Sequence, residues 1–512
     1  MIEDFQNAMR LIRVGRILAR HDALFILKEM GMPTGIQWLA KFGSIRRNRK
    51  GRKGQRLSRA LQEAGPSFIK LGQALSTRSD LFGEEMCDDL SHLQDQIPPF
   101  TARLAREAIV KELGQPIEDL YSEFDDTPVA AASIAQVHFA VTNDGEEVAV
   151  KVLRPNIEHA FQRDLNLFRW AARMIERTVP GMRRLRPVQS VEILAETIQM
   201  EMDLRFEAAA ASELAENFQG DPTFYVPAVF LQHSGRRVLT IERINAIPLD
   251  DRKAIIEAGL NPVDVLEKAA NAFFNQVFRD GFFHADLHPG NLFVDRNGII
   301  NVVDFGIMGR LTLKDRRFLG ELLIGFLRRD YRSVAEVHFR AGWVPAHKSV
   351  DSFTQAARAI AEPILDKPQN EVSIGRLLGL LFHITQTFDM EAQPQLLLLQ
   401  KTMLVSEGTA RKLAPEANMW MISRPLIEAW MIKNLGPQAR VKVGVDTVIE
   451  TLERLPSVIE NLEKGAAMIA SGQLKLDPKT VRALRGDNGP IRITPYIWAA
   501  LAAGLILLAH LV

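Results

Sequence analysis

The sequence is poor in cysteine and in the larger aromatic residues, and its charges almost cancel. Cys87 is the only cysteine in 512 residues, which excludes an internal disulfide bond and is typical of a reducing compartment. With 4 tyrosines, 6 tryptophans and a formal net charge of +1, the chain indicates neither a base-stacking surface nor a global attraction to nucleic acid. The N-terminus carries Glu3 and Asp4 and no long apolar core, so we expect neither a secretory signal nor an acid-poor transit peptide.

The far C-terminus lacks charge altogether. Residues 493–512, ITPYIWAALAAGLILLAHLV, contain no Asp, Glu, Lys or Arg. As a helix they would span about 30 Å, the hydrocarbon thickness of a bilayer. Tyr496 and Trp498 stand where interfacial aromatic residues are common, and the arginines that precede the stretch favour a cytoplasmic near side. We therefore predict a C-terminal transmembrane helix, with a buried core helix as the alternative.

A basic run lies near the other end of the chain. From Lys41 to Gln62 there are nine Lys or Arg residues and no acidic residue. Such a run is either a solvated, flexible face or a patch that faces anionic lipid headgroups, and the sequence leaves both open.

Residues 281–309 hold two acidic residues at the spacing of a protein kinase. His284-Ala285-Asp286 is followed, five residues after the aspartate, by Asn291, and a strand–turn–strand pattern leads to Asp304-Phe305-Gly306. Phosphoryl transfer requires an aspartate that orients the attacking oxygen, and an Asn and a second Asp that hold magnesium against the phosphates. Either triplet alone would be a weak signal, but the pair joined by a tight hairpin predicts a kinase-like site.

Residues 124–155 are typical of the smaller lobe of a kinase. They predict strands separated by a small-residue turn and by the turn Asn143-Asp144-Gly145, the last strand ending near Lys151. Lys151 closes a Val-Ala-Val-Lys sequence, as does the kinase lysine that holds the α and β phosphates of ATP. Glu207, on a helix predicted from about Ser190, is the candidate ion-pair partner of Lys151, although an acidic residue on a helix is usually solvated.

The glycine-rich loop that covers the phosphates in kinases is absent. The segment in its place consists of Val129, Ala130, Ala131, Ala132, Ser133, Ile134, Ala135, Gln136 and Val137. Alanine restricts φ and adds methyl groups, so this loop should approach phosphates less freely than a glycine loop. Residues 237–244 predict the strand that enters the hinge, and the helical patterns after Gly309 predict a helical large lobe.

Four segments in order carry a resemblance to the UbiB/ADCK family of atypical kinases. They are Phe68-Ile69-Lys70-Leu71-Gly72-Gln73, the alanine-rich loop, Glu201-Met202-Asp203 and His284-Ala285-Asp286. The resemblance covers roughly residues 25 to 410 and implies an α+β fold with two kinase-like lobes and a helical N-terminal extension. It implies Asp286 as catalytic acid/base, Lys151 paired with Glu207 as the phosphate-holding residue, and Asn291 and Asp304 as magnesium ligands. It further implies that residues 129–137 form the nucleotide loop and that Lys70 and Gln73 face Glu201 and Asp203.

The same resemblance implies a function. Members bind and hydrolyse ATP with magnesium, support ubiquinone biosynthesis at the bacterial inner membrane, and lack ordinary protein-kinase activity because the KxGQ segment covers the substrate position. The implied partners are membrane lipids, quinone intermediates and other ubiquinone-biosynthesis proteins, with no nucleic acid and an open oligomeric state. This chain has room for one clear C-terminal membrane helix, whereas some relatives have two.

Two other functions remain as hypotheses. The sequence Asp286-Leu287-His288-Pro289-Gly290-Asn291 is also similar to the loop of aminoglycoside and choline kinases, which are small-molecule phosphotransferases, although those enzymes lack the KxGQ helix. A pseudokinase scaffold that binds nucleotide without turnover is the other, although it would not need all of Lys151, Asp286, Asn291 and Asp304. 

We predict the following division of the chain. It consists of an N-terminal helical and basic segment (1–56), the KxGQ extension (57–120), the small lobe (121–245), the large lobe (246–440), an amphipathic helix with linker (441–490) and the anchor (493–512).

Overall fold

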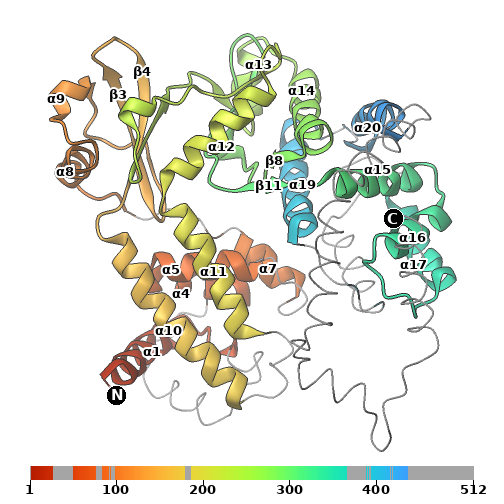
Figure 1. The fold of residues 1–512 in the computed structure, drawn as a ribbon, viewed down its shortest axis with the longest axis horizontal. Coiled ribbons are helices and arrows are strands. Elements are labelled where there is room, and N and C mark those ends of the chain that lie inside the picture. The colour runs from red at the N-terminus through yellow and green to blue at the C-terminus, as the bar shows by residue number, and fades with distance from the viewer. Residues whose placement is uncertain are drawn as a thin grey trace, which may run out of the picture. The chain divides into compact units, whose positions relative to one another are not determined.

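The computed structural model describes residues 2–26, 50–76, 83–91, 98–178, 186–365, 394–415 and 419–435, together with residues 93, 388, 390 and 417 (Figure 1). The predicted amphipathic helix with its linker and the predicted membrane anchor both lie outside these residues. Within the described part of the chain, no helix is long and apolar enough to cross a membrane.

An antiparallel sheet forms the centre of the small lobe. Its order is β1-β3-β4-β6, with β2 paired to β3. Val148, Val150 and Val152 alternate along β4 and are fully buried on one face, which places Lys151 on the other face, opposite Val137 and Leu239. The strands on both sides of the predicted turn at residues 143–145 are thus confirmed. The bounds are β1 (Tyr121–Phe124), β2 (Ala130–Ala131), β3 (Ala135–Thr142), β4 (Glu147–Leu153) and β6 (Val238–Glu242).

Helices cover both faces of this sheet. On the valine face lie α8 (Ala102–Leu113) and α9 (Ile117–Leu120), whose Ile109, Ile117 and Leu120 join the same core cluster. On the lysine face lies α12 (Leu204–Asn217), which packs Leu204 and Ala208 against the sheet. Thr101 occupies the N-cap position of α8, but its side chain makes no capping hydrogen bond.

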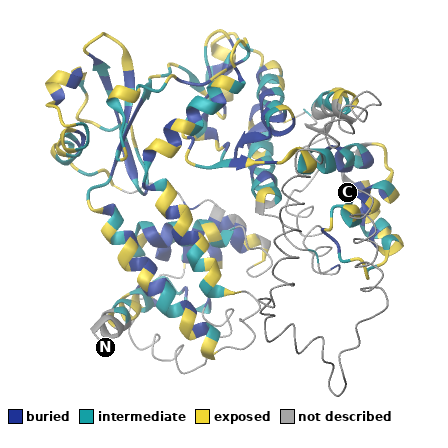
Figure 2. Cartoon of the chain, viewed as in Figure 1, coloured by how far each residue is buried: buried dark blue, intermediate teal, exposed yellow. Residues whose placement is uncertain are grey.

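A layer of helices lies before and after the small-lobe strands in sequence. It consists of α1 (Ile2–Arg20), α4 (Lys53–Ala64), α5 (Pro66–Ser76), α7 (Glu84–Ser91), α10 (Ile157–Thr178) and α11 (Pro187–Glu201). Their apolar faces meet in one core, in which Phe68 of α5 packs edge-on against Phe168 of α10 at 5.0 Å between ring centroids. Figure 2 shows these buried faces turned toward one another. The segment that carries Lys70 is therefore fixed by a core of its own.

Part of the basic run belongs to this layer. Arg52 forms an ion pair with Asp89, and Arg56 forms one with Asp22 at 3.0 Å. Both arginines form ion pairs within the chain, so neither is simply part of a solvated face.

The large lobe begins with short strands that hold the segments predicted to be catalytic. One sheet has the order β5-β10-β9-β7, and a separate pair joins β11 to β8. The antiparallel pairing of β9 and β10 confirms the predicted hairpin between Asn291 and Asp304. The bounds are β5 (Phe224–Tyr225), β7 (Ile247–Pro248), β8 (Phe282–His284), β9 (Leu292–Val294), β10 (Ile300–Val302) and β11 (Met308–Arg310).

Helices form the remainder of the described large lobe. They are α13 (Arg252–Glu257), α14 (Pro262–Phe274) with a π-helical continuation at Asn275–Asp280, α15 (Leu313–Leu327), α16 (Tyr331–Arg340), α17 (Val350–Leu365), α19 (Pro394–Leu413) and α20 (Met419–Leu435). Short 3-10 turns lie at Leu231–His233 and Pro289–Asn291. The sequence patterns after Gly309 predict helices at 314–328, 331–341, 350–365, 374–388 and 394–410. The structure confirms the first three and the last as α15, α16, α17 and α19, and it adds α20, which was not predicted. The helix predicted at 374–388 falls outside the described residues apart from Phe388.

One helix prediction was wrong. The continuous helix expected from Ser190 through Glu207 is divided into α11 and α12, because Asp203 leaves the helical conformation and caps α12 by accepting a hydrogen bond from the Arg205 backbone N–H at 3.2 Å. The break lets Glu201 and Glu207 belong to two helices with different directions.

Candidate active site

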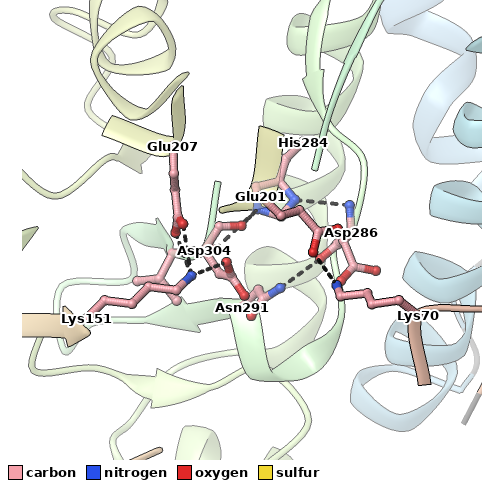
Figure 3. Close-up of polar contacts among 9 residues, drawn as sticks. Lys70, Lys151, Glu201, Glu207, His284, Asp286, Asn291 and Asp304 are labelled. Atoms are coloured by element: carbon pink, nitrogen blue, oxygen red, sulfur yellow. Dashed lines mark hydrogen bonds and ion pairs between the residues drawn. The ribbon is translucent and has the colours of Figure 1, made fainter. Parts of the chain in front are cut away.

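Lys151 lies between two carboxylates from opposite lobes. Its Nζ is 2.7 Å and 3.0 Å from the two carboxylate oxygens of Glu207, and 2.8 Å from Oδ1 of Asp304 (Figure 3). Strand β4 presents the lysine, α12 presents Glu207 on the same face of the sheet, and the end of β10 leads to Asp304. The structure therefore brings together three residues that the sequence separates by more than 150 positions.

The pKa values of this triad reflect one cation shared by two acids. Burial alone would lower the pKa of Lys151, but the charges of Asp304 and Glu207 outweigh it and raise that pKa above its usual range. The charge of Lys151 lowers the pKa of Asp304, and Lys70 contributes in the same direction. Burial raises the pKa of Glu207 to about 7, against the opposing charge of Lys151. Of the two acids, Glu207 is thus the first to take up a proton.

The catalytic loop is held in place by His284. This histidine is fully buried, and its Nε2 lies 2.8 Å from the backbone carbonyl oxygen of Asp304 and 3.2 Å from that of Val303. Its Nδ1 accepts a hydrogen bond from the backbone N–H of Asp286 at 3.2 Å. Burial lowers the pKa of His284, which favours the neutral ring that can donate from one nitrogen and accept at the other. His284 thereby joins the segments that carry Asp286 and Asp304.

Asn291 is positioned by hydrogen bonds of both its side chain and its backbone. Its side-chain Nδ2 donates to the backbone carbonyl of Asp286 at 3.0 Å, and its own backbone carbonyl accepts from Val303 N–H at 3.0 Å. Asn291 therefore lies at the same end of the β9–β10 hairpin as Asp304. The Asp304 backbone has φ of +63°, a left-handed conformation that aspartate tolerates better than most residues.

The donor set of this hairpin end fits magnesium. An amide oxygen and a half-exposed carboxylate are the hard oxygen ligands that the ion prefers, and magnesium commonly takes its other ligands from water and substrate phosphates. Among the described residues, no group of three or more His, Cys, Asp or Glu side chains could hold a metal ion by itself. Asn291 and Asp304 would therefore hold the ion together with a nucleotide.

The alanine-rich loop is a tight hairpin beside Lys151. Val129 N–H donates to the Val137 carbonyl at 2.9 Å, and Ala132 N–H donates to the Ala135 carbonyl at 2.8 Å. Ser133 is buried in the turn, and its hydroxyl has no hydrogen-bond partner within the described residues. Gln136 points elsewhere, because its side chain bonds the backbone N–H and carbonyl of Phe100 at 3.0 Å and 3.2 Å. The loop therefore lies next to the strand of Lys151, but Gln136 holds the backbone of Phe100 and does not face that site.

Helix α5 brings Lys70 to the end of α11. Lys70 Nζ lies 2.8 Å from Oε2 of Glu201, with side-chain exposures of 12% and 9%. Asp203, which was expected on the same surface, pairs with the side chain of Arg205 and caps α12. Gln73 lies three residues after Lys70 on α5, a spacing that places both on the same side of the helix.

Two residues of α19 that the sequence did not reveal also contact the catalytic loop. Lys401 Nζ lies 3.3 Å from Oδ1 of Asp286, and the Thr402 hydroxyl donates to the backbone carbonyl of Ala285 at 2.9 Å. Lys401 lies 115 residues after Asp286, and neither Lys401 nor Thr402 belongs to a motif named above. A single lysine on a helix gives no sequence signal that distinguishes it from a solvated one.

The comparisons with known proteins agree with this geometry. Residues 92–338 match the ABC1 atypical kinase-like domain, and residues 357–418 match the UbiB helical domain. A Marinobacter nauticus protein named "Probable protein kinase UbiB" is 41% identical over 486 residues, 94% of this chain and 89% of that protein. A protein of the same name from Vibrio parahaemolyticus is 45% identical over 424 residues, 81% of this chain and 78% of that protein.

A solved structure shows the same fold. A Mycobacterium tuberculosis protein, described as a complex with erythromycin, superposes with a TM-score of 0.52 and is 26% identical, over 72% of this chain and 93% of that one. The predicted kinase-like fold of mixed helix and sheet is thereby confirmed. The chain belongs to the ABC1/UbiB family of atypical kinase-like proteins.

Proposed function

We propose that this protein is a membrane-anchored, ATP-hydrolysing member of its family that supports ubiquinone biosynthesis by assisting enzymes that act on lipid quinone intermediates. The observation that carries the ATP-dependent part is the position of Lys151 between Glu207 and Asp304, beside the hairpin that holds Asp286 and Asn291. The quinone part is supported by the relatives named UbiB. The anchor is supported by the sequence of residues 493–512.

Each residue has a defined task in this proposal. Lys151 exchanges its contact with Asp304 for the α and β phosphates, while Glu207 keeps the lysine in place. Asn291 and Asp304 would hold magnesium, which when bound would neutralise phosphate charge. Asp286 orients the attacking oxygen and accepts its proton.

The position of α5 favours ATP hydrolysis over phosphorylation of large protein substrates, because the resemblance implies that its KxGQ segment covers the substrate position. The Lys70–Glu201 pair connects α5 to α11, immediately before the helix that carries Glu207. A small-molecule phosphotransferase is the second candidate, favoured by the partial exposure of Asp286, whose side chain is 35% exposed. Phosphate found on a soluble alcohol, instead of free phosphate, would favour that candidate.

The experiment is quinone profiling of cells that lack the protein, complemented with wild type or with Asp286→Asn. We expect wild type to restore ubiquinone and the variant to leave early lipid intermediates in place. Purified protein assayed in parallel for magnesium-dependent phosphate release should show the same difference. Equal ubiquinone levels with both forms would refute catalysis at Asp286 and favour a nucleotide-binding scaffold.

A further inference from the structure

The contact between α19 and the catalytic loop involves two consecutive residues. Thr402 is fully buried, and its hydroxyl lies 2.9 Å from both the Ala285 carbonyl and the Leu398 carbonyl of its own helix. This places the preceding residue, Lys401, beside Asp286, with Nζ 3.3 Å from Oδ1. The side chains of Lys401 and Asp286 are 30% and 35% exposed, so the pair is accessible to solvent. The buried Thr402 holds this part of α19 against the loop.

The catalytic loop does not supply a cation of its own. Residues 284–291, HADLHPGN, contain no Lys or Arg. His288 is engaged inside the loop, where its Nδ1 accepts the Gly290 N–H at 3.2 Å. A positive charge facing the Asp286 carboxylate therefore has to come from another element, and in the described structure α19 provides one.

We propose that Lys401 is a positioning residue that orients the carboxylate of Asp286 for proton transfer, an inference that rests on the function proposed above. In the reaction, the attacking oxygen of water forms a bond to the γ-phosphorus while the bond from that phosphorus to the β–γ bridging oxygen breaks. The electron pair of the broken bond leaves with ADP. The proton of the attacking water goes to one carboxylate oxygen of Asp286, and Lys401 holds the other oxygen, Oδ1.

This role predicts a specific kinetic pattern. Loss of orientation at the acid/base residue should lower kcat for ATP hydrolysis by about 10-fold to 100-fold, since a small misplacement of a catalytic group has effects of this size. The KM for ATP should stay within about 2-fold, because Lys401 contacts Asp286 and not the phosphate-holding Lys151. Lys401→Arg keeps a cation and should recover part of the lost rate.

The experiment compares full-length Lys401→Gln and Lys401→Arg with Lys412→Gln as the matched control. Lys412 lies eleven residues further along the same helix, is 63% exposed and has its Nζ 3.7 Å from Asp250 instead of Asp286. We expect magnesium-dependent ATP hydrolysis to fall in Lys401→Gln, to recover in part in Lys401→Arg and to remain unchanged in Lys412→Gln. Adding Lys401→Gln to Asp286→Asn should change the residual rate by less than about 2-fold, because the lysine acts through that carboxylate.

Three outcomes would overturn the inference. If Asp286→Asn is inactive while Lys401→Gln has the wild-type kcat, Lys401 has no positioning role and the proposed function stands. If Lys401→Gln lowers the melting temperature and the bound nucleotide in proportion to activity, the lysine serves folding instead. If Asp286→Asn itself retains the wild-type rate, both this inference and the proposed function fail.

Discussion

At the scale of single residues, the site depends on one lysine that neutralises two acids. The sequence predicted Lys151, Glu207 and Asp304, because motif order along a kinase-like chain limits where such residues can stand. It did not predict the contact of Lys401 with Asp286 or the hydrogen bonds of Gln136 with Phe100, since both depend on contacts between distant segments. Sequence motifs thus predict residues that the fold brings together, while the residues that contact them from distant segments appear only in the folded chain.

Removal of the charge of Lys151 or of Asp304 should strongly reduce the proposed ATP hydrolysis. We expect Lys151→Ala and Asp304→Asn each to lower magnesium-dependent ATP hydrolysis by about 100-fold to 1000-fold, about 3–4 kcal/mol in the transition state. Asn tolerates the positive φ at position 304, so that variant removes charge without adding backbone strain. The measurements are phosphate release and nucleotide binding by calorimetry, and activity within a few-fold of wild type would refute the assignment.

The raised pKa of Glu207 predicts a pH dependence of stability. The folded protein binds this proton more tightly than the unfolded chain, whose pKa is near 4.5, so the proton stabilises the folded state. The stabilisation is complete below about pH 4.5 and is lost as the pH rises through about 7, a change of about 3 kcal/mol. Nucleotide-free wild type should therefore lose melting temperature across this window relative to Glu207→Gln. Parallel melting curves for the two proteins from pH 5 to 8 would contradict this prediction.

At the scale of elements, α5 acts through one nearly buried ion pair. Lys70 is the only cation between Pro66 and Thr77, and it meets Glu201. The family resemblance implied a helical extension here, and α5 begins at Pro66. The sequence did not predict the end of α11 at Glu201, because the break depends on the capping side chain of Asp203.

The Lys70 pair should restrain transfer of phosphate to the protein itself. Removing one partner of a buried pair strands the other charge and costs about 3–5 kcal/mol, so Lys70→Ala should loosen α5. We expect radiolabel transfer from ATP to the protein to rise in Lys70→Ala, with loss of ubiquinone support in cells. Lys70→Ala combined with Glu201→Ala should recover melting temperature, because no charge is left stranded. Unchanged labelling and unchanged ubiquinone would assign α5 to ordinary packing.

Replacing an alanine of the loop by glycine tests the second difference from ordinary kinases, the absence of a glycine-rich loop. The hairpin at Ala130 pairs with Val137, and glycine there would let the backbone approach phosphates more freely. We expect Ala130→Gly to change the ratio of ATP to ADP affinity, measured by calorimetry with magnesium. Identical affinities for both nucleotides in variant and wild type would show that the alanine methyl has no such effect.

Close packing explains the glycine of the KxGQ segment. A Cβ at Gly72 would overlap Leu93 and lie 2.7 Å from Leu61 Cδ1, whereas one at Gly408 in α19 meets nothing within 4 Å. We expect Gly72→Ala to lower the free energy of unfolding by about 1–3 kcal/mol. The matched variant Gly408→Ala should raise it by about 0.5–1 kcal/mol. Thermal melting of both variants tests the pair, and a neutral Gly72→Ala would show that the neighbouring leucines can move.

At the scale of the whole molecule, the two lobes and the helical extension were expected from the family resemblance, while single strands and hairpins followed from local sequence patterns. The hydrophobic alternation of β4 and the hairpin of β9 and β10 were predictable because they depend on neighbouring residues. The ion pairs of Arg52 and Arg56 were not predictable, because the sequence of a basic run does not show whether its partners are lipids or distant acidic residues. The predicted domain boundaries stay predictions.

Deletion of residues 493–512 should release the protein from membranes only in part. The apolar stretch supplies most of the insertion energy, while each remaining cation of the basic run contributes about 1 kcal/mol near an anionic surface. We expect the truncated protein to sediment with anionic vesicles at low salt and to dissociate at high salt, with full-length protein retained in both. A truncated protein that is fully soluble at low salt would limit the basic run to contacts within the chain.

The contact between Lys70 and Glu201 has a thermodynamic consequence of its own. The charge of Lys70 also helps to lower the pKa of Asp304, so the position of α5 and the proposed nucleotide site are electrostatically coupled. Linkage then requires reciprocity: any molecule that draws α5 away from Glu201 must change nucleotide affinity by the same factor by which nucleotide changes the affinity for that molecule. A bound lipid or protein that acts on α5 could therefore be recognised by titrating nucleotide alone, with and without it, before its own binding site is known.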